Sequence, residues 1–140
     1  MVQHSVLPTT GPWALEVDPV YGTVGSTTYT VHVRSDLTST ATLGKQRTVT
    51  ISAKGQDALI TVPVHAGKEL RYAISGSTFA AATVGDDYGV RAGGGEPVPR
   101  GASSGVLGTS WDDTPRAIRV NPVAGATGSL KITFTEVDPG

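Results

Sequence analysis

Residues 58–76 read ALITVPVHAGKELRYAISG, and this stretch contains two candidate β-strands joined by a short turn. Residues 58–64 form an apolar, β-branched run of strand length. His65–Lys68 then supplies a turn with a glycine. Beyond the turn, apolar and polar residues alternate up to Gly76, with Leu70, Tyr72 and Ile74 on one side and Arg71, Ala73 and Ser75 on the other. Because Pro63 has no backbone N–H, we expect the first strand to be an edge strand or to carry a bulge near its end.

The same two-residue period recurs along the rest of the chain. Further candidate strands lie at residues 28–34, 48–53, 79–84, 88–91, 117–120 and 130–135. No eleven-residue window sustains apolar positions at helical spacing, so helix should be minimal. The pattern predicts an all-β protein, a single antiparallel β-sandwich of eight or nine strands, with jelly-roll and immunoglobulin-like topologies both open.

Composition limits the classes of function. The chain has 140 residues, 12 acidic against 11 basic side chains, and no cysteine. This length suits one domain, and the absence of cysteine excludes disulfides and thiolate metal sites. The basic residues are scattered, so nucleic acid is not an expected partner. No run is apolar enough to span a membrane and no secretory signal is recognisable, so we expect synthesis in the cytoplasm and no membrane association.

Two segments lack strand patterning. Residues 1–12 contain Pro8 and Pro12 and predict an extended N-terminal arm, which leaves 13–140 as the sandwich domain. Residues 92–115 are crowded with glycine and proline and predict one long irregular loop. A loop of that length inside a compact domain is typical of a functional or partner-binding segment.

One motif raises the question of catalysis. Residues 101–105, Gly-Ala-Ser-Ser-Gly, match the G-x-S-x-G pattern of a nucleophile elbow around Ser103. An elbow requires a strand-to-helix turn with its histidine later in the chain, whereas His4, His32 and His65 all precede Ser103. We therefore interpret the motif as part of the loop and expect no enzymatic activity.

Acidic pairs raise the question of metal binding. Asp86-Asp87 and Asp112-Asp113 lie in candidate loops, and calcium prefers such oxygen ligands. Neither pair has EF-hand spacing, and aspartate is also a common turn residue. The histidines have no spacing that places two imidazoles on one zinc ion. We expect turn residues here, with no metal and no cofactor.

Aromatic residues adjoin both acidic pairs. Tyr88 follows Asp87 and Trp111 precedes Asp112, and large amphipathic rings on loops suit protein interfaces. Two other interpretations of Trp111 stay open: capping of the core, and a platform for a sugar ring. The candidate partner-contact residues are Pro8, Pro12, Trp13, Tyr88, Trp111, Asp112 and Asp113.

Residues 62–76 show the pattern of a strand, an Ala-Gly turn and a second strand, and residues 121–134 repeat it. This pattern resembles small β-sandwich proteins of tailed bacteriophages. These are capsid decoration and minor structural proteins. The resemblance implies a non-enzymatic virion protein that decorates or stabilises a capsid, located in the virion, bound to the major capsid protein or another virion protein, and homo-oligomeric. The alternatives are a carbohydrate-binding module that uses Tyr88 and Trp111, with or without calcium, and a small hydrolase around Ser103.

Overall fold

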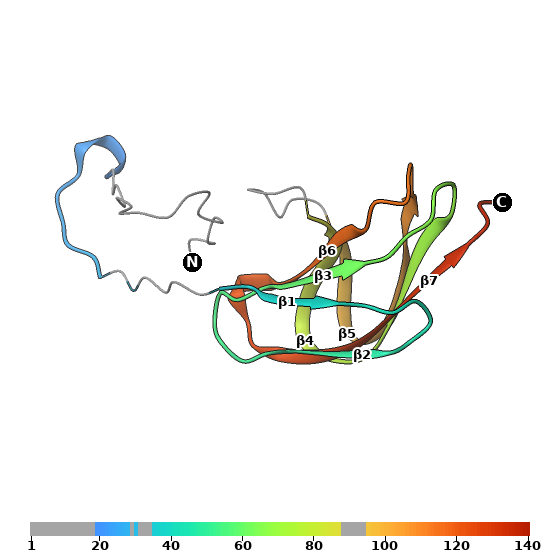
Figure 1. Ribbon diagram of the computed structural model, residues 1–140. Coiled ribbons are helices and arrows are strands. Elements are labelled where there is room, and N and C mark those ends of the chain that lie inside the picture. Colours follow the sequence, from blue (N-terminus) through green and yellow to red (C-terminus); the bar gives the residue numbers. More distant parts are fainter. Residues whose placement is uncertain (1–18, 29, 31–34, 88–94) are drawn as a thin grey trace.

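A computed structural model describes residues 19–28, 30, 35–87 and 95–140 (Figure 1). These residues form seven β-strands and two three-residue 3₁₀ turns, η1 (Val20–Gly22) and η2 (Val123–Gly125). The strands are β1 (Leu37–Thr40), β2 (Arg47–Ile51), β3 (Ala58–Val62), β4 (Glu69–Asp86), β5 (Glu96–Thr109), β6 (Arg116–Pro122) and β7 (Gly128–Val137). The all-β prediction is confirmed. The predicted strands at 28–34 and 88–91 lie largely or wholly outside the described residues.

All seven strands belong to one mixed sheet. The strand order is β1-β3-β6-β4-β7-β2, and β5 pairs with β4. The prediction of purely antiparallel pairing is wrong, because β1 runs parallel to β3. The sheet curls until β1 and β2 face each other, where the Arg47 guanidinium donates to the Thr40 carbonyl. The result is a sheet nearly closed into a barrel, as Figure 1 shows.

The long strand β4 joins the two wings of the sheet. Residues 69–75 of β4 pair with β7, and residues 82–86 pair with β6. The expected strand end at Gly76 is therefore wrong, and the predicted strand at 79–84 is the second half of β4. Gly76 has φ +59°, a conformation available to glycine, and it lies where the register against β5 shifts. The glycine marks a bulge that bends the strand without ending it.

These bulges keep the core side of β4 facing inward. Buried positions fall on even residue numbers at 70–74, on odd numbers at 77–79, and on even numbers again at 82–84. Register shifts in the β4–β5 pairing lie between the blocks. Each shift moves the side-chain alternation by one residue, so a strand of 18 residues follows the curve of the barrel while its apolar side stays inside.

Residues 96–109 correct the prediction of a long loop. They form the strand β5, whose side chains alternate between exposed and half-buried from Gly101 to Leu107. A large neighbour covers one glycine of this strand: a Cβ at Gly105 would lie 2.6 Å from the Tyr72 hydroxyl oxygen. An aromatic ring packed over a glycine stabilises a strand that lacks side chains of its own. Composition suggested a loop, whereas Tyr72 supplies the missing packing.

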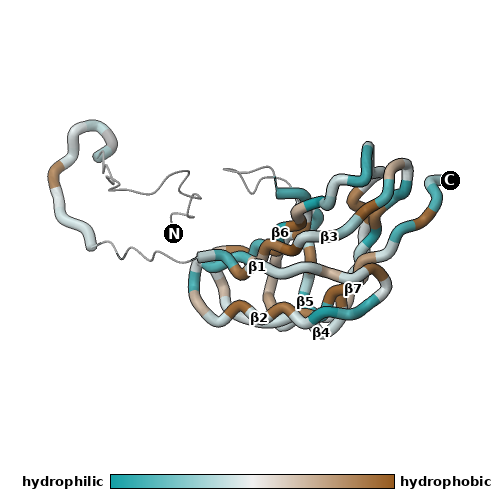
Figure 2. Tube along the Cα trace, viewed as in Figure 1, coloured by the Kyte–Doolittle hydropathy of each residue, from teal (hydrophilic) through white to brown (hydrophobic). Residues whose placement is uncertain are grey.

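One apolar core fills the curled sheet. It includes Leu70, Phe79, Ile118, Ile132 and Phe134, drawn from both wings. On β7 the buried Leu130, Ile132 and Phe134 alternate with outward polar residues, as predicted, and Figure 2 shows this alternation in colour along the strands. In the described part of the chain, no helix is long and apolar enough to cross a membrane.

The position of β3 is a further correction. It lies between β1 and β6, so it is not an edge strand, and it ends at Val62. Pro63 is the first residue after the strand and therefore removes no ladder hydrogen bond. The proline acts as a stop before the turn, and not as protection of an edge.

Candidate functional site

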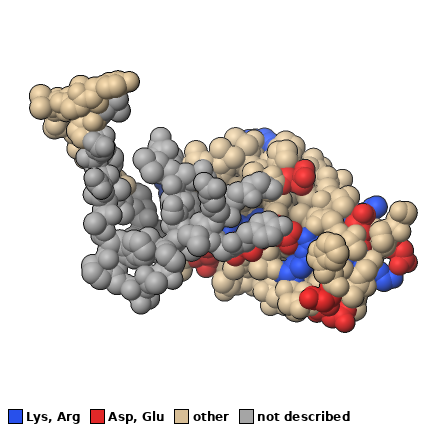
Figure 3. Space-filling view, turned by 90° about the horizontal axis from the view of Figure 1, so that it is seen from above, with Lys and Arg blue, Asp and Glu red and all other residues tan. Residues whose placement is uncertain are grey.

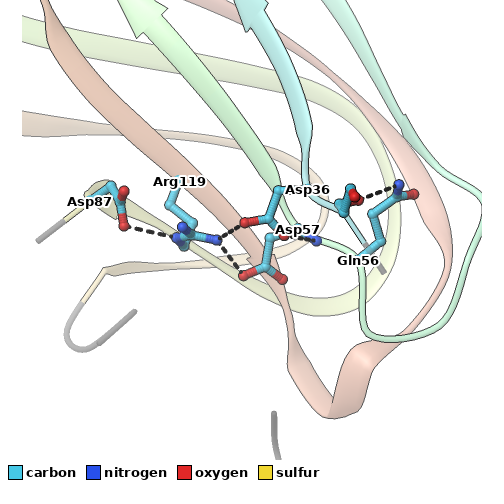
Figure 4. Close-up of polar contacts among 6 residues, drawn as sticks. Asp36, Gln56, Asp57, Asp87 and Arg119 are labelled. Carbon is cyan, nitrogen blue, oxygen red and sulfur yellow. Dashed lines mark hydrogen bonds and ion pairs between the residues drawn. The ribbon is translucent and has the colours of Figure 1, made fainter. Parts of the chain in front are cut away.

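Two groups of polar residues stand out in the described part of the chain, one exposed and one mostly buried. The first, which we call the tip, comprises residues 65–68, 110–114 and 136–138. These are the β3–β4 loop, the β5–β6 loop and the end of β7, which lie at the same end of the molecule in Figure 1. The second, which we call the Arg119 cluster, comprises Arg119, Asp36, Asp57 and Asp87 (Figure 4).

Backbone pairing joins the two loops of the tip. The Gly67 N–H donates to the Ser110 carbonyl at 2.8 Å, and the Ser110 N–H donates to the Lys68 carbonyl at 2.9 Å. The Asp113 carboxylate accepts the Ala66 N–H at 2.8 Å. These three bonds fix the β5–β6 loop against the β3–β4 loop on both sides of residue 111.

Trp111 projects from this braced loop. Its side chain is 98% exposed, although Ser110 beside it is buried. Asp112 accepts the Thr114 N–H at 2.8 Å in a turn, and this hydrogen bond lowers the pKa of Asp112 below its usual value. The interpretation of Trp111 as a core cap is therefore wrong, since the ring lies in solvent. A solvent-facing indole on a braced loop is suited to contact with another molecule.

Within the tip, ion pairs connect the β3–β4 loop to the end of β7. The Glu136 carboxylate accepts the His65 N–H at 2.6 Å and contacts the His65 Nδ1 at 2.7 Å. The hydrogen bond and the charge of Glu136 raise the pKa of His65 above its usual value. Lys68 Nζ lies 2.6 Å from Asp138 Oδ1, which raises the pKa of Lys68. Figure 3 shows basic and acidic side chains side by side at this end of the molecule.

The Arg119 cluster ties four chain segments together below the surface. The Arg119 guanidinium, 6% exposed, contacts Asp36 at 2.7 Å, Asp57 at 3.0 Å and Asp87 at 3.0 Å. Burial lowers the pKa of Arg119, but the hydrogen bonds to these carboxylates outweigh it, so the pKa is raised and the side chain stays charged. Asp36 precedes β1, Asp57 precedes β3 and Asp87 follows β4, so one side chain on β6 holds three strand ends.

Arg116 makes a second link of the same kind. Its guanidinium binds the Asp86 carboxylate through Nε, at 2.8 Å, and through a second nitrogen. It also donates to the carbonyls of Gly108, at 3.2 Å, and Leu107. These contacts join the end of β4 to the end of β5, which leads directly into the β5–β6 loop of the tip.

The sequence-predicted site residues separate into two groups. Pro8, Pro12, Trp13 and Tyr88 lie outside the described residues. Trp111, Asp112 and Asp113 come together at the tip. The Asp112 carboxylate accepts the Thr114 N–H within its own turn, whereas the Asp113 carboxylate accepts the Ala66 N–H of the β3–β4 loop. Asp86 and Asp87 bind arginines. Among the residues described, no group of three or more histidine, aspartate or glutamate side chains is arranged to hold a metal ion.

Ser103 is not at an elbow. It lies inside β5, opposite Ile74, with its hydroxyl buried and without a hydrogen-bond partner. A nucleophile elbow exposes its serine at a sharp turn, and Ser103 has neither the turn nor the exposure. The loop interpretation of residues 101–105 is also wrong, because these residues are strand.

Sequence reasoning missed the residues that brace the tip and the cluster. His65 and Glu136 are 71 residues apart, and Arg119 and Asp36 are 83 apart, so no local motif connects them. One signal was available for Arg119: it stands between Ile118 and Val120 in a candidate strand, and a charged residue there requires a partner.

No protein-family model matches the chain, and no curated protein matches its sequence. Two solved structures are similar. One is Aeromonas hydrophila PliG, a periplasmic lysozyme inhibitor of g-type lysozyme, at 17% identity and a TM-score of 0.51, covering 74% of this chain and 98% of PliG. The other is the pre-peptidase C-terminal domain of collagenase from Bacillus anthracis, at 9% identity and a TM-score of 0.50, covering 74% of this chain and 100% of that domain. At these identities the likeness concerns the fold alone.

Proposed function

We propose that this protein is a non-enzymatic structural protein of a bacteriophage particle, which attaches to the major capsid protein or another virion protein through the tip. The observation that carries the proposal is Trp111, 98% exposed on a loop whose neighbours are held by hydrogen bonds. The virion setting comes from the resemblance of residues 62–76 and 121–134 to small phage β-sandwich proteins.

The tip has the properties of an interface anchor. Tryptophan is enriched among the few residues that supply most of the binding energy at protein interfaces. Because the loops beside Trp111 are already fixed by Ser110, Gly67 and Asp113, little loop ordering remains to oppose binding. The tip also carries charged side chains, among them Lys68, Asp112 and Asp138, and interfaces commonly combine an apolar centre with a polar rim.

Co-sedimentation tests this proposal. The protein is mixed with capsids assembled from the major capsid protein encoded in the same genome, and pelleted with wild-type and Trp111→Ala chains. We expect the wild type to pellet with the capsids and Trp111→Ala to lose most of that binding. Val123→Ala is the matched control, because Val123 is an exposed apolar residue of η2, outside the tip. Equal pelleting of Trp111→Ala and wild type would refute attachment through the tip.

A carbohydrate-binding role is the second candidate that Trp111 favours, since an exposed indole also stacks on sugar rings. The nearby carboxylates support it less, because Asp112 and Asp113 each use an oxygen to accept a backbone N–H. A glycan array with and without calcium separates the two functions. Binding to a glycan that Trp111→Ala abolishes supports this candidate, and silence under both conditions removes it.

We also propose the finer architecture of a sandwich, in which the wing β2-β7-β4 and the wing β4-β6-β3-β1 act as two layers. The support is that β4 belongs to both wings and that their inner faces share one core. Such a compact body suits a particle protein, because a rigid scaffold presents its tip in one orientation.

A further inference from the structure

The tip carries an excess of negative charge. Its titratable residues are four carboxylates, one lysine and one histidine: Asp112, Asp113, Glu136, Asp138, Lys68 and His65. Lys68 pairs with Asp138 at 2.6 Å, so these two charges cancel. His65 lies 2.7 Å from Glu136, and this pair is neutral when the imidazole is protonated. The carboxylates of Asp112 and Asp113 account for the excess that remains even then.

The charges of Asp112 and Asp113 have no ion-pair partner in the described part of the chain. Asp112 accepts the Thr114 N–H at 2.8 Å, and hydrogen bonds from Thr114 lower its pKa. Asp113 accepts the Ala66 N–H at 2.8 Å. These donors are neutral, so they hold the carboxylates in place without cancelling their charge. Because a carboxylate has about four acceptor sites, both side chains can also bind a cationic donor.

The arginines that follow in the chain are already engaged. Arg116 binds the Asp86 carboxylate and two carbonyl groups of β5. Arg119 is 6% exposed and contacts three carboxylates. The counter-charge for Asp112 and Asp113 is therefore expected from another molecule.

Trp111 supplies the apolar part of the same surface. Its indole is 98% exposed, and because consecutive Cα atoms are about 3.8 Å apart, the two carboxylates that follow it are close neighbours. A guanidinium group can use both features, since it stacks on an indole face and donates hydrogen bonds to carboxylates. We propose that the tip binds a basic surface of its partner protein, on which an arginine stacks on Trp111 and pairs with Asp112 and Asp113. This inference rests on the proposed attachment through the tip and names the chemistry of the partner there.

Capsid co-sedimentation with charge variants and added salt tests the inference. Asparagine keeps an oxygen that accepts a backbone N–H and removes the charge, so Asp112→Asn/Asp113→Asn should fold as the wild type does. We expect this variant to raise the dissociation constant about tenfold, and NaCl between about 50 and 500 mM to weaken the wild type more than the variant. Glu96→Gln is the matched control, because Glu96 is exposed on β5 outside the tip.

One result of this experiment separates the inference from the proposed function. If Trp111→Ala removes capsid binding but neither salt nor the asparagine variant changes it, the attachment through the tip stands and the inference is overturned.

Titration with short peptides tests the same chemistry without capsids. The probes are hexaarginine, hexalysine and hexaglutamate. The readout is the NMR signal of the Trp111 indole N–H, assigned by its absence in a Trp111→Phe chain because the sequence has two tryptophans. We expect hexaarginine to shift this signal more than hexalysine does, and hexaglutamate to leave it unchanged. The asparagine variant should reduce the hexaarginine shift about threefold or more at equal peptide concentration, and Glu96→Gln should not.

The peptide results decide the inference when capsids do not bind. Hexaarginine shifts that depend on Asp112 and Asp113 then support a basic partner, although the attachment to capsids has failed. An unchanged indole signal, or an equal shift in the asparagine variant, overturns the inference. Equal shifts from hexalysine and hexaarginine overturn the role of arginine.

Discussion

The Arg119 cluster and the tip use the same residue types at different depths. Arg119 is 6% exposed and meets three carboxylates, whereas at the tip Lys68 and Asp138 meet in solvent. A buried charge without its partner is strongly destabilising, while an exposed pair contributes little. From this difference we expect the cluster to contribute strongly to the stability of the fold, and substitutions of exposed side chains at the tip to cost little stability.

The largest expected effect comes from removing the centre of the cluster. Arg119→Met leaves Asp36, Asp57 and Asp87 facing one another without a cation, and we expect a loss of about 3–5 kcal/mol in the free energy of unfolding. Urea denaturation measures it. Arg71→Met is the matched control, because Arg71 pairs with Glu69 on the exposed side of β4, and its loss should stay below about 1 kcal/mol. Equal losses in the two variants would remove the distinction between cluster and surface.

The next largest effect is the loss of stability on removing single carboxylates of the Arg119 cluster, which should increase with their burial. The side chain of Asp57 is 2% exposed and that of Asp36 is 23% exposed, and both contact the same Arg119 nitrogen. We expect Asp57→Ala to cost about 2–3 kcal/mol and Asp36→Ala about 1 kcal/mol, because charge-assisted hydrogen bonds gain strength where water is excluded. Thermal and urea unfolding of both variants check the order. A reversed order would mean that strand-end geometry, and not burial, sets the contribution.

The amino-acid sequence predicts those strands whose residues alternate between buried and exposed positions. The alternation in residues 70–74 and 130–134 identified two central strands, since a strand with one buried face must alternate. It missed β5, where Tyr72 on another strand stabilises a glycine-rich edge, and it divided β4 at Gly76, where a bulge continues the strand. Both errors arise because tertiary packing overrides local composition.

The candidate site was predictable to the same extent. Trp111 was recognisable as a large aromatic residue in a loop, and Asp112 as a turn residue, because these roles depend on neighbours in the chain. The bond from the Ala66 N–H to Asp113 was not predictable in this way, because Ala66 lies 47 residues away. The supports of the loop, Glu136 and the backbone of residues 66–68, lie far away in sequence. The Arg119 cluster was unpredictable for the same reason. Asp36, Asp57 and Asp87 reach Arg119 only when four separate chain segments meet in the folded protein.

A smaller effect concerns the pH dependence of the tip. The pKa of His65 is raised by Glu136, so the folded state holds the proton more tightly than the unfolded chain, whose pKa is near 6.5. The stabilisation is therefore fully present below pH 6.5 and is lost as pH rises through the higher folded pKa. An NMR titration of the His65 ring measures the pKa. Glu136→Gln should return it toward 6.5, and an unchanged value would show that the pair does not persist in solution.

The smallest expected effect on stability belongs to Trp111, and it is the sharpest test of the comparison. Trp111→Ala removes a side chain that is 98% exposed, so the free energy of unfolding should change by less than about 0.5 kcal/mol. Under the proposed function, in which the indole is the anchor of the tip, the same substitution should remove most of the capsid binding. Urea denaturation and co-sedimentation on one preparation measure both. If stability falls by as much as it does in Asp57→Ala, the indole packs on the domain in solution, and the tip then belongs with the Arg119 cluster as part of the fold.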